Sequence, residues 1–197
     1  MTKLNAPDLA KVEVAVDNML KTLNLNVKDE HLKDTPRRIA KMFVNELLHG
    51  LYNDPPEITC FEAKSSTPVI VDNISVRSLC SHHFLPFYGY AVVYYSPKDK
   101  IAGLSKFSRI VNYFAARPQV QERLTTEIAH YLTEQLKPWF LFVGLKCRHM
   151  CLATRGAKDS AAVMTTYTLV HDVEFQNSST LSDVTRTGLD LLSNIHV

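Results

Sequence analysis

The 197-residue sequence has no long apolar run and no strong excess of charge of one sign. No window approaches the roughly 18 apolar residues of a membrane-spanning helix, and the first residues contain no apolar core of the signal-peptide type. Lys and Arg number 22 against 20 Asp and Glu, so the surface as a whole is not one that binds polyanions. We therefore expect a cytoplasmic protein whose partners include neither a membrane nor a nucleic acid.

Glycine, proline and cysteine are also scarce. Six Gly and nine Pro, with 46% hydrophobic residues, exclude a disordered or fibrous chain and suffice for one buried core. There is no internal repeat. The four cysteines of a cytoplasmic protein do not indicate a disulfide framework, which leaves metal binding, catalysis or simple burial as their role.

Hydrophobic periodicity predicts helices, then strands, then helices, strands and a last helix. Thr35-Pro36 is typical of a cap followed by the first helical residue, and Pro97-Lys98-Asp99-Lys100 is typical of a hairpin turn. This grouping predicts an α+β fold, an antiparallel sheet with helices packed on one face. It is preceded by an N-terminal helical region over 1–54, with the second domain over 55–197. The expected ranges are helices at 8–24 and 36–50, two strands between 68 and 95, helices at 107–114 and 120–136, strands at 139–152 and 160–171, and a helix at 180–194.

Two segments hold the residue types of a metal site. In LCSHHF (79–84), Cys80 and His83 are three positions apart and can converge on one ion from a turn. The second segment runs from Cys147 to Cys151 with His149 between them, and in a strand the alternation would put these three side chains on one face. The two segments could meet across adjacent strands and together supply enough ligands for zinc.

The number of ligands decides what such a site would do. Four protein ligands, with Cys147 included, would close the zinc and make it structural, whereas three ligands and a water leave it reactive. In the reactive case His82 and His149 are imidazoles beside the metal, and imidazole transfers protons near neutral pH. The plainer alternative makes the cysteines core residues and the histidines hydrogen-bonded packing residues.

A third segment, GLSKFSR (103–109), opens a predicted helix. Ser105 could cap that helix, and the free backbone N–H groups of its first turn favour an anion. Lys106 and Arg109 share one side of the helix, and Arg155 adds a further cation. The alternative is an ordinary solvated basic face.

Glu122 occupies the first turn of the next predicted helix, after Gln121. The helix dipole favours a carboxylate there without any function. A carboxylate can also accept two parallel N–H bonds from a planar donor such as the N1–H and amino edge of guanine, and sequence alone does not choose between the two.

Five pieces of the chain resemble the GTP cyclohydrolase I family, in the same order and over about residues 34–192. They are DTPRRIAKMF (34–43), LCSHHF (79–84), GLSKFSRIV (103–111), ARPQVQERLT (116–125) and RHMCLATRGAKDS (148–160). The resemblance implies an enzyme that opens the imidazole ring of GTP, releases C8 as formate and forms 7,8-dihydroneopterin triphosphate.

The resemblance also implies roles for single residues. Zn²⁺ would be held by Cys80, His83 and Cys151 with water in the fourth place, so that Cys147 is left out. His149 would be the main acid/base residue, with His82 as its neighbour. Glu122 and Gln121 would hold the guanine. The triphosphate and ribose would be held by Ser105, Lys106, Arg109 and Arg155, joined by Lys41 and Arg38.

The family uses the tunnelling fold, in which sheets of several subunits close into a barrel. A homodecamer of toroidal shape is therefore implied, with active sites between subunits. This chain departs from the family pattern at Ser81, where a glutamate is usual, and in SAAVMTTYT (160–168), which keeps only part of a threonine-rich run. Two other hypotheses stay open: a related tunnelling-fold enzyme of purine or pterin chemistry, and a non-catalytic structural zinc protein.

Overall fold

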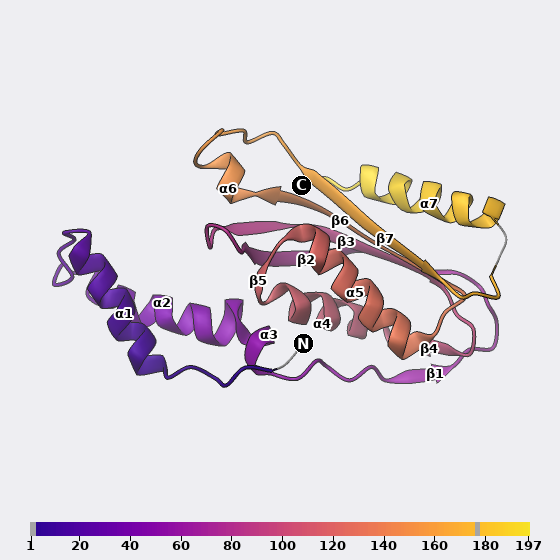
Figure 1. Ribbon diagram of the computed structural model, residues 1–197, viewed down its shortest axis with the longest axis horizontal. Coiled ribbons are helices and arrows are strands. Elements are labelled where there is room, and N and C mark those ends of the chain that lie inside the picture. Colours follow the sequence, from indigo (N-terminus) through magenta and orange to yellow (C-terminus); the bar gives the residue numbers. More distant parts are fainter. Residues whose placement is uncertain (1–2, 176–177) are drawn as a thin grey trace. The chain divides into compact units, whose positions relative to one another are not determined.

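The computed structural model describes residues 3–175 and 178–197. The chain forms two compact units, residues 1–54 and 55–197, and each is described here by itself (Figure 1). Among the described helices, none is long and apolar enough to cross a membrane.

The first unit is helical. Its elements are α1 (Leu9–Thr22), α2 (Thr35–Lys41), a π-helical segment (Met42–Leu47) and α3 (His49–Tyr52). Asp8 caps α1 by accepting hydrogen bonds from the backbone N–H groups of Ala10 and Lys11. Val16 and Leu20 of α1 and Ala40 of α2 are buried within this unit.

The second helix differs from the expectation in two respects. It starts one residue earlier, with Asp34 in the cap position and Thr35 inside the helix. The helical segment also continues past Gly50 to Tyr52 and is divided into α2, the π-helical segment and α3. At the end of the π-helical segment, the N–H of Leu48 bonds to the carbonyl of Phe43, five residues back, at 2.9 Å. A bond of that span widens one turn into a π-helix, which hydrophobic periodicity does not reveal.

The second unit is built on a five-stranded sheet in the order β5-β2-β3-β6-β7. All neighbouring strands are antiparallel except β2 and β5, which pair in parallel at Leu79–Pro118 and Cys80–Gln119. A separate ladder joins β1 and β4. The strands are β1 (Cys60–Glu62), β2 (Val69–Cys80), β3 (Pro86–Ser96), β4 (Lys100–Ala102), β5 (Pro118–Gln119), β6 (Phe140–His149) and β7 (Met164–His171).

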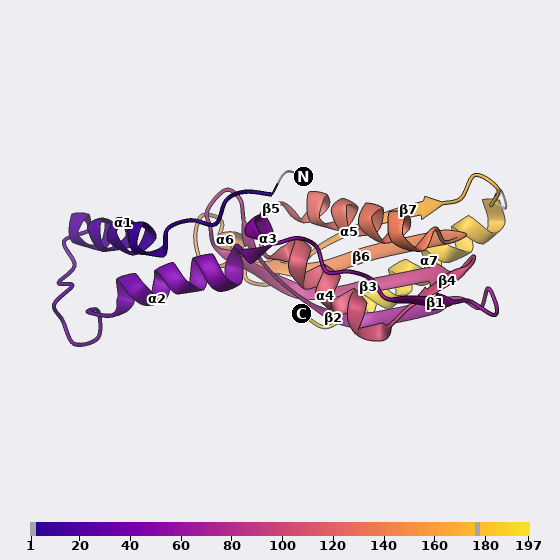
Figure 2. The same ribbon diagram turned by 90° about the horizontal axis from the view of Figure 1, so that it is seen from below.

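Helices cover both faces of this sheet (Figures 1 and 2). The helices α4 (Leu104–Ala115) and α5 (Gln121–Leu136) pack against one face, and α7 (Ser178–Ser193) packs against the other. Alternation along β6 divides the two cores, since Leu141 and Val143 belong to the α4/α5 side and Phe140 and Phe142 to the α7 side. The short helix α6 (Met150–Ala153) follows β6.

The predicted α+β class is confirmed, with three local corrections. Helices do not lie on one face only, because α7 covers the second face. The turn at Pro97–Lys100 does not close a hairpin, because β4 pairs with β1 and not with β3. The strand expected over 139–152 ends at His149, where the chain enters α6, and this last difference bears on the site.

Candidate functional site

The connection between β2 and β3 brings Cys80 and His83 together. The N–H of Phe84 bonds to the carbonyl of Cys80 at 2.9 Å, and the N–H of Cys80 bonds to the carbonyl of Leu85 at 2.8 Å. The first bond closes a single helical turn, in which residues three apart lie on the same side. Phe84 ends that turn with a φ of 53°, a conformation that costs a bulky residue free energy and that clusters at functional sites.

The end of β6 brings Cys151 to the same edge of the sheet. On one side of β3, Leu79 of β2 pairs with Pro86, and on the other side His149 of β6 pairs with Phe87. The chain therefore leaves β2 and β6 at neighbouring positions on either side of β3. Because α6 begins directly after His149, Cys151 lies on a helical turn and not on the strand face that the sequence predicted.

Cys80, His83 and Cys151 form a group of potential metal ligands. One ligand atom of each lies within 4.8 Å of the others. Two thiolate sulfurs at about 2.3 Å from one zinc ion lie at most about 4.6 Å apart, so this donor set needs little adjustment to hold zinc. Two sulfurs and one imidazole nitrogen are also the ligand types that zinc prefers.

Cys147 does not belong to that group. Its side chain is fully buried in the core under α4 and α5, and burial raises the pKa of its thiol to about 12. Within the described part of the chain, the group has three members, and Cys147 is not one of them. This geometry argues against the closed structural site considered from the sequence.

The thiol of Cys151 is affected by its neighbours. Burial raises the pKa of Cys151, and the adjacent Cys80 raises it further, while the charge of Arg155 lowers it. A cation bound at this group would stabilise Cys151 as a thiolate.

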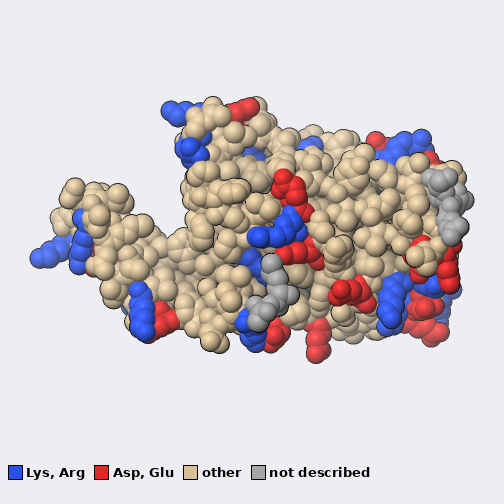
Figure 3. Space-filling view, viewed as in Figure 1, with Lys and Arg blue, Asp and Glu red and all other residues tan. Residues whose placement is uncertain are grey.

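Two further side chains lie against the ligand group. Arg155 donates a hydrogen bond from Nη1 to Nε2 of His83 at 2.8 Å, and Nδ1 of His82 lies 3.8 Å from Sγ of Cys80. Arg155 and Lys158 are exposed in the loop after α6, where Figure 3 shows Lys and Arg atoms gathered at the end of this unit. The structure therefore brings the imidazole of His82 and the positive charge of Arg155 next to the group of potential metal ligands.

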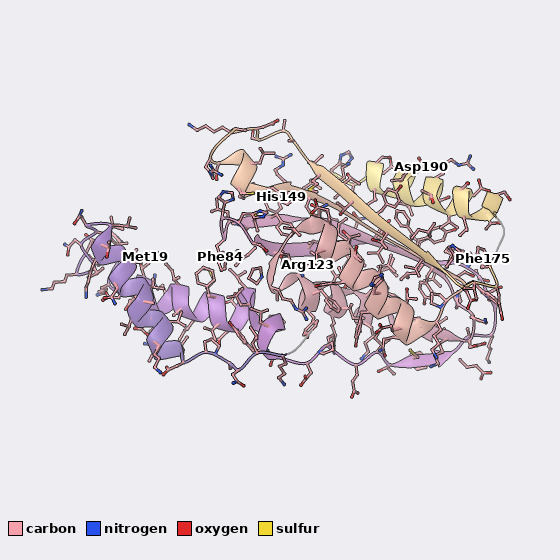
Figure 4. All side chains as sticks on the ribbon, viewed as in Figure 1. Met19, Phe84, Arg123, His149, Phe175 and Asp190 are labelled. Carbon is pink, nitrogen blue, oxygen red and sulfur yellow. The ribbon has the colours of Figure 1, made fainter. Side chains whose placement is uncertain are left out.

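His149 is held between α5 and β3 (Figure 4). Its ring stacks on Phe87 with centroids 4.7 Å apart and planes 10° apart, and its Nε2 lies 2.9 Å from Oε1 of Gln121. Burial lowers the pKa of His149, and the nearby carboxylate of Glu122 opposes that shift. A largely neutral imidazole held in one orientation is suited to accept a proton.

The residues of α5 divide between the interior and the surface. Gln121 is 1% exposed, with its side-chain amide hydrogen-bonded inside the chain. Glu122 is exposed in the first turn of α5, as predicted from the sequence. Of the two residues expected at the guanine, only Glu122 therefore presents its side chain to solvent.

The cationic segment of α4 lies away from the ligand group in the same chain. Gly103 is the cap of α4, so Ser105 does not cap it, and the expected capping role was wrong. The other end of α4 leads to β5, where Gln119 pairs with Cys80. At 1.5 Å per residue, Ser105 lies about 15 Å along the helix axis from Ala115 at that end. Lys106 is half-buried and Arg109 exposed on the same helix.

Lys41 belongs to the first unit. It is exposed at the last residue of α2, as is Arg38 one turn earlier. The role expected for Lys41 stays a prediction.

Two contributors to the site were missed from the sequence. Phe87 was not singled out, although an aromatic residue directly after LCSHHFLP is a candidate to pack on a neighbouring ring. Thr166 was noted only as a remnant of a threonine-rich run, yet its hydroxyl bonds to the amide of Gln121. The run itself was the available signal, because threonines on alternate positions of a strand face a neighbouring element.

Known proteins resemble this chain over most of its length. The family model described as GTP cyclohydrolase I matches residues 12–187. A protein of Wigglesworthia glossinidia brevipalpis named GTP cyclohydrolase 1 is 40% identical, covering 84% of this chain and 78% of its own. Proteins of the same name from Aeromonas salmonicida and Carboxydothermus hydrogenoformans are 43% and 44% identical, covering 81% and 77% of this chain and 74% and 80% of theirs.

Proposed function

The chain belongs to the GTP cyclohydrolase I family, and from that premise we propose that it converts GTP to 7,8-dihydroneopterin triphosphate. The reaction adds water at C8 of guanine, opens the imidazole ring, releases C8 as formate and rearranges the ribose. The observation that carries the proposal is the three-membered group of Cys80, His83 and Cys151, which lies beside an oriented imidazole, His149, in a family whose members bear this name.

Zn²⁺ is the cofactor that the donor set fits best. Cys80, His83 and Cys151 would hold it, and the buried Cys147 would not. When bound, zinc would supply Lewis-acid chemistry that lowers the pKa of water from about 15.7 towards 7. A closed structural site would need a fourth protein ligand, which the described residues do not offer there.

His149 and His82 are the proposed proton-transfer residues. His149 has a ring orientation fixed by Phe87 and Gln121, and a lowered pKa keeps it neutral and able to accept a proton near pH 7. The protonated ring can then deliver that proton to the nitrogen that leaves C8. His82 is exposed beside Cys80 and would serve as the second proton carrier at the reacting ring.

Glu122 is the proposed anchor for guanine. Its exposed carboxylate lies in the first turn of α5, directly after Gln121, whose side chain contacts His149. A carboxylate there can accept both N–H groups of the guanine edge and so place the purine against the imidazole.

The triphosphate is proposed to lie on Ser105, Lys106, Arg109 and Arg155. Arg155 lies at the ligand group, whereas Lys106 is about one helix length from it in the same chain. One site that uses both residues therefore draws Lys106 from another subunit.

Association through the sheet edges would supply that second subunit. The outer edge of β7 has no partner among the described strands, and β5 pairs with only the last two residues of β2. Open edges are closed in barrels formed by several sheets. This supports a toroidal homodecamer with sites between subunits, as the family resemblance implies.

The activity is tested by incubating the protein with GTP and measuring formate together with the pterin fluorescence that appears after oxidation. We expect equal amounts of both products, loss of both after chelation, and recovery on addition of Zn²⁺. Absence of formate from zinc-loaded protein would contradict the proposed activity, and activity that survives complete metal removal would contradict the zinc.

Sharing of the site is tested by subunit complementation. Lys106→Ala and Cys151→Ala are each expected to be inactive as pure oligomers. If one site combines Lys106 of one subunit with Cys151 of another, random mixing after co-expression should restore about a quarter of the wild-type sites. No recovery in mixed oligomers would place both residues in a site within one chain.

A further inference from the structure

We propose that Gln121 is a positioning residue which holds the His149 ring as the tautomer with its hydrogen on Nε2, so that Nε2 donates to the amide and Nδ1 is left as a hydrogen-bond acceptor. The inference rests on the proposed function for its kinetic consequence, but its structural part stands on the contacts of α5, β6 and β7. It replaces the guanine-binding role that the sequence suggested for Gln121.

The side-chain amide of Gln121 can point in only one direction. Its Nε2 lies 3.2 Å from the carbonyl oxygen of Leu145 and 3.0 Å from that of Met164. Carbonyl oxygens accept and never donate hydrogen bonds. A flipped amide would set its own oxygen against both carbonyls in a site that is 1% exposed, at the full cost of unsatisfied buried polar groups.

Two threonine hydroxyls support the same direction. Thr125 donates to the carbonyl oxygen of Gln121 at 2.8 Å, so its one hydrogen is used. The hydroxyl of Thr166, 2.7 Å from that of Thr125, must then donate to it. The remaining lone pair of Thr166 accepts from Nε2 of Gln121 at 3.1 Å, which agrees with the direction set by the carbonyls.

With the amide direction fixed, the oxygen Oε1 of Gln121 faces His149. Oε1 only accepts hydrogen bonds, so Nε2 of His149, 2.9 Å away, carries the proton and donates it. In a neutral imidazole the other nitrogen, Nδ1, is then bare. Stacking on Phe87 prevents the ring from tilting out of this arrangement.

This arrangement separates the two nitrogens by function. The hydrogen bond from Nε2 to Gln121 is the same in the neutral ring and in the imidazolium, because both carry the Nε2 proton. The ring can therefore keep this orientation without rearrangement of the buried amide. A ring free to change tautomer would present a bare Nδ1 for only part of the time and in a less defined position.

The side chain of Gln121 is not accessible to guanine. Both amide hydrogens are shared among Leu145, Met164 and Thr166, and Oε1 accepts from His149 in a position that is 1% exposed. Removal of the amide should therefore reduce turnover more than GTP affinity.

The test compares Gln121→Met with Gln119→Met on zinc-loaded full-length protein. Gln119 is an equally buried glutamine two residues earlier. Its amide nitrogen donates to Phe114 and Glu127, and its amide oxygen accepts from Arg123, where that of Gln121 accepts from a histidine. For Gln121→Met we expect kcat to fall about 10- to 100-fold, with the KM for GTP within about threefold of wild type. For Gln119→Met we expect kcat within about threefold of wild type. A rise in KM with unchanged kcat in Gln121→Met would return Gln121 to guanine binding.

The tautomer is measured directly and without a variant of Gln121. The ¹⁵N spectrum of histidine-labelled wild-type protein at pH 8 separates a protonated ring nitrogen from a bare one, and the His149 signals are those lost in His149→Gln. We expect a protonated Nε2 and a bare Nδ1. A protonated Nδ1 would overturn the proposal even if GTP were turned over, whereas inactive protein with the expected spectrum would overturn only the proposed function.

Discussion

Replacement of Gly89 by alanine should disrupt the sheet at the strand pair that positions the site. Gly89 lies on β3 opposite Cys147 of β6, two residues after Phe87, which faces His149. A Cβ atom on Gly89 would lie 2.0 Å from the carbonyl oxygen of Lys146 and 2.8 Å from Cα of Cys147. Both neighbours are backbone atoms, so no side chain can turn away to make room.

The size of the effect follows from that distance. Real Cβ contacts are almost never shorter than 3.0 Å, so β3 and β6 must separate by about 1 Å, enough to break backbone hydrogen bonds of normal length. Overpacking costs typically about 1–3 kcal/mol, and each lost bond adds about 0.5–1.5 kcal/mol. We expect a loss of about 3 kcal/mol or more, which lowers the thermal midpoint by roughly 6–12 °C.

The assay is thermal unfolding followed by the fluorescence of Trp139, the one tryptophan of the chain, at equal protein concentration because association shifts the midpoint. Gly103→Ala is the matched control. A Cβ there meets only Phe61 and Lys106 side-chain atoms at 3.9 and 4.0 Å. We therefore expect Gly103→Ala to lower the thermal midpoint by at most about 4 °C. A midpoint for Gly89→Ala as high as that of the control would refute the reasoning.

Four further predictions concern the site. Cys151→Ala should lose zinc and turnover together, while Cys147→Ala should keep its zinc by metal analysis; zinc loss in Cys147→Ala would favour a closed site. Because burial raises the pKa of Cys147 to about 12, its thiolate is scarce below that pH, and mass spectrometry should find it unalkylated after iodoacetamide treatment of native protein at pH 8. His149→Ala should retain zinc but lower kcat by about 10²- to 10⁴-fold, and normal turnover would remove it from catalysis. Glu122→Ala should abolish GTP binding in calorimetry, and unchanged affinity would exclude it from the guanine site.

The elements and the ligand types could be read from the sequence because they depend on local patterns. Apolar spacing located α1, α4, α5 and α7, and the three-residue interval between Cys80 and His83 indicated one shared ion. The position of Cys151 relative to them could not be derived from spacing, since the predicted alternation needed a strand through residue 152. The strand ends at His149, and a helical turn places Cys151 instead.

Short strands were the weakest part of the prediction. The ladder of β1 with β4 and the two-residue β5 depend on partners far along the chain, and segments of two or three residues carry no periodicity of their own. The packing of α7 on the second face of the sheet was not predicted for a related reason. The amphipathic pattern of this helix indicates that one side of it is buried, but not which face of the sheet it packs against.

The residue types and their spacing along the chain define the chemical groups available to it: two thiols, imidazoles, a carboxylate and cations in a family's order. How these groups are combined depends on the folded arrangement. The register of β3 with β6 sets His149 on Phe87 and leaves Cys147 in the core, and the packing of α5 on β6 and β7 aims the amide of Gln121 at His149. The physical reason is that the direction of a hydrogen bond depends on partners brought close by folding, and distance along the chain does not encode them.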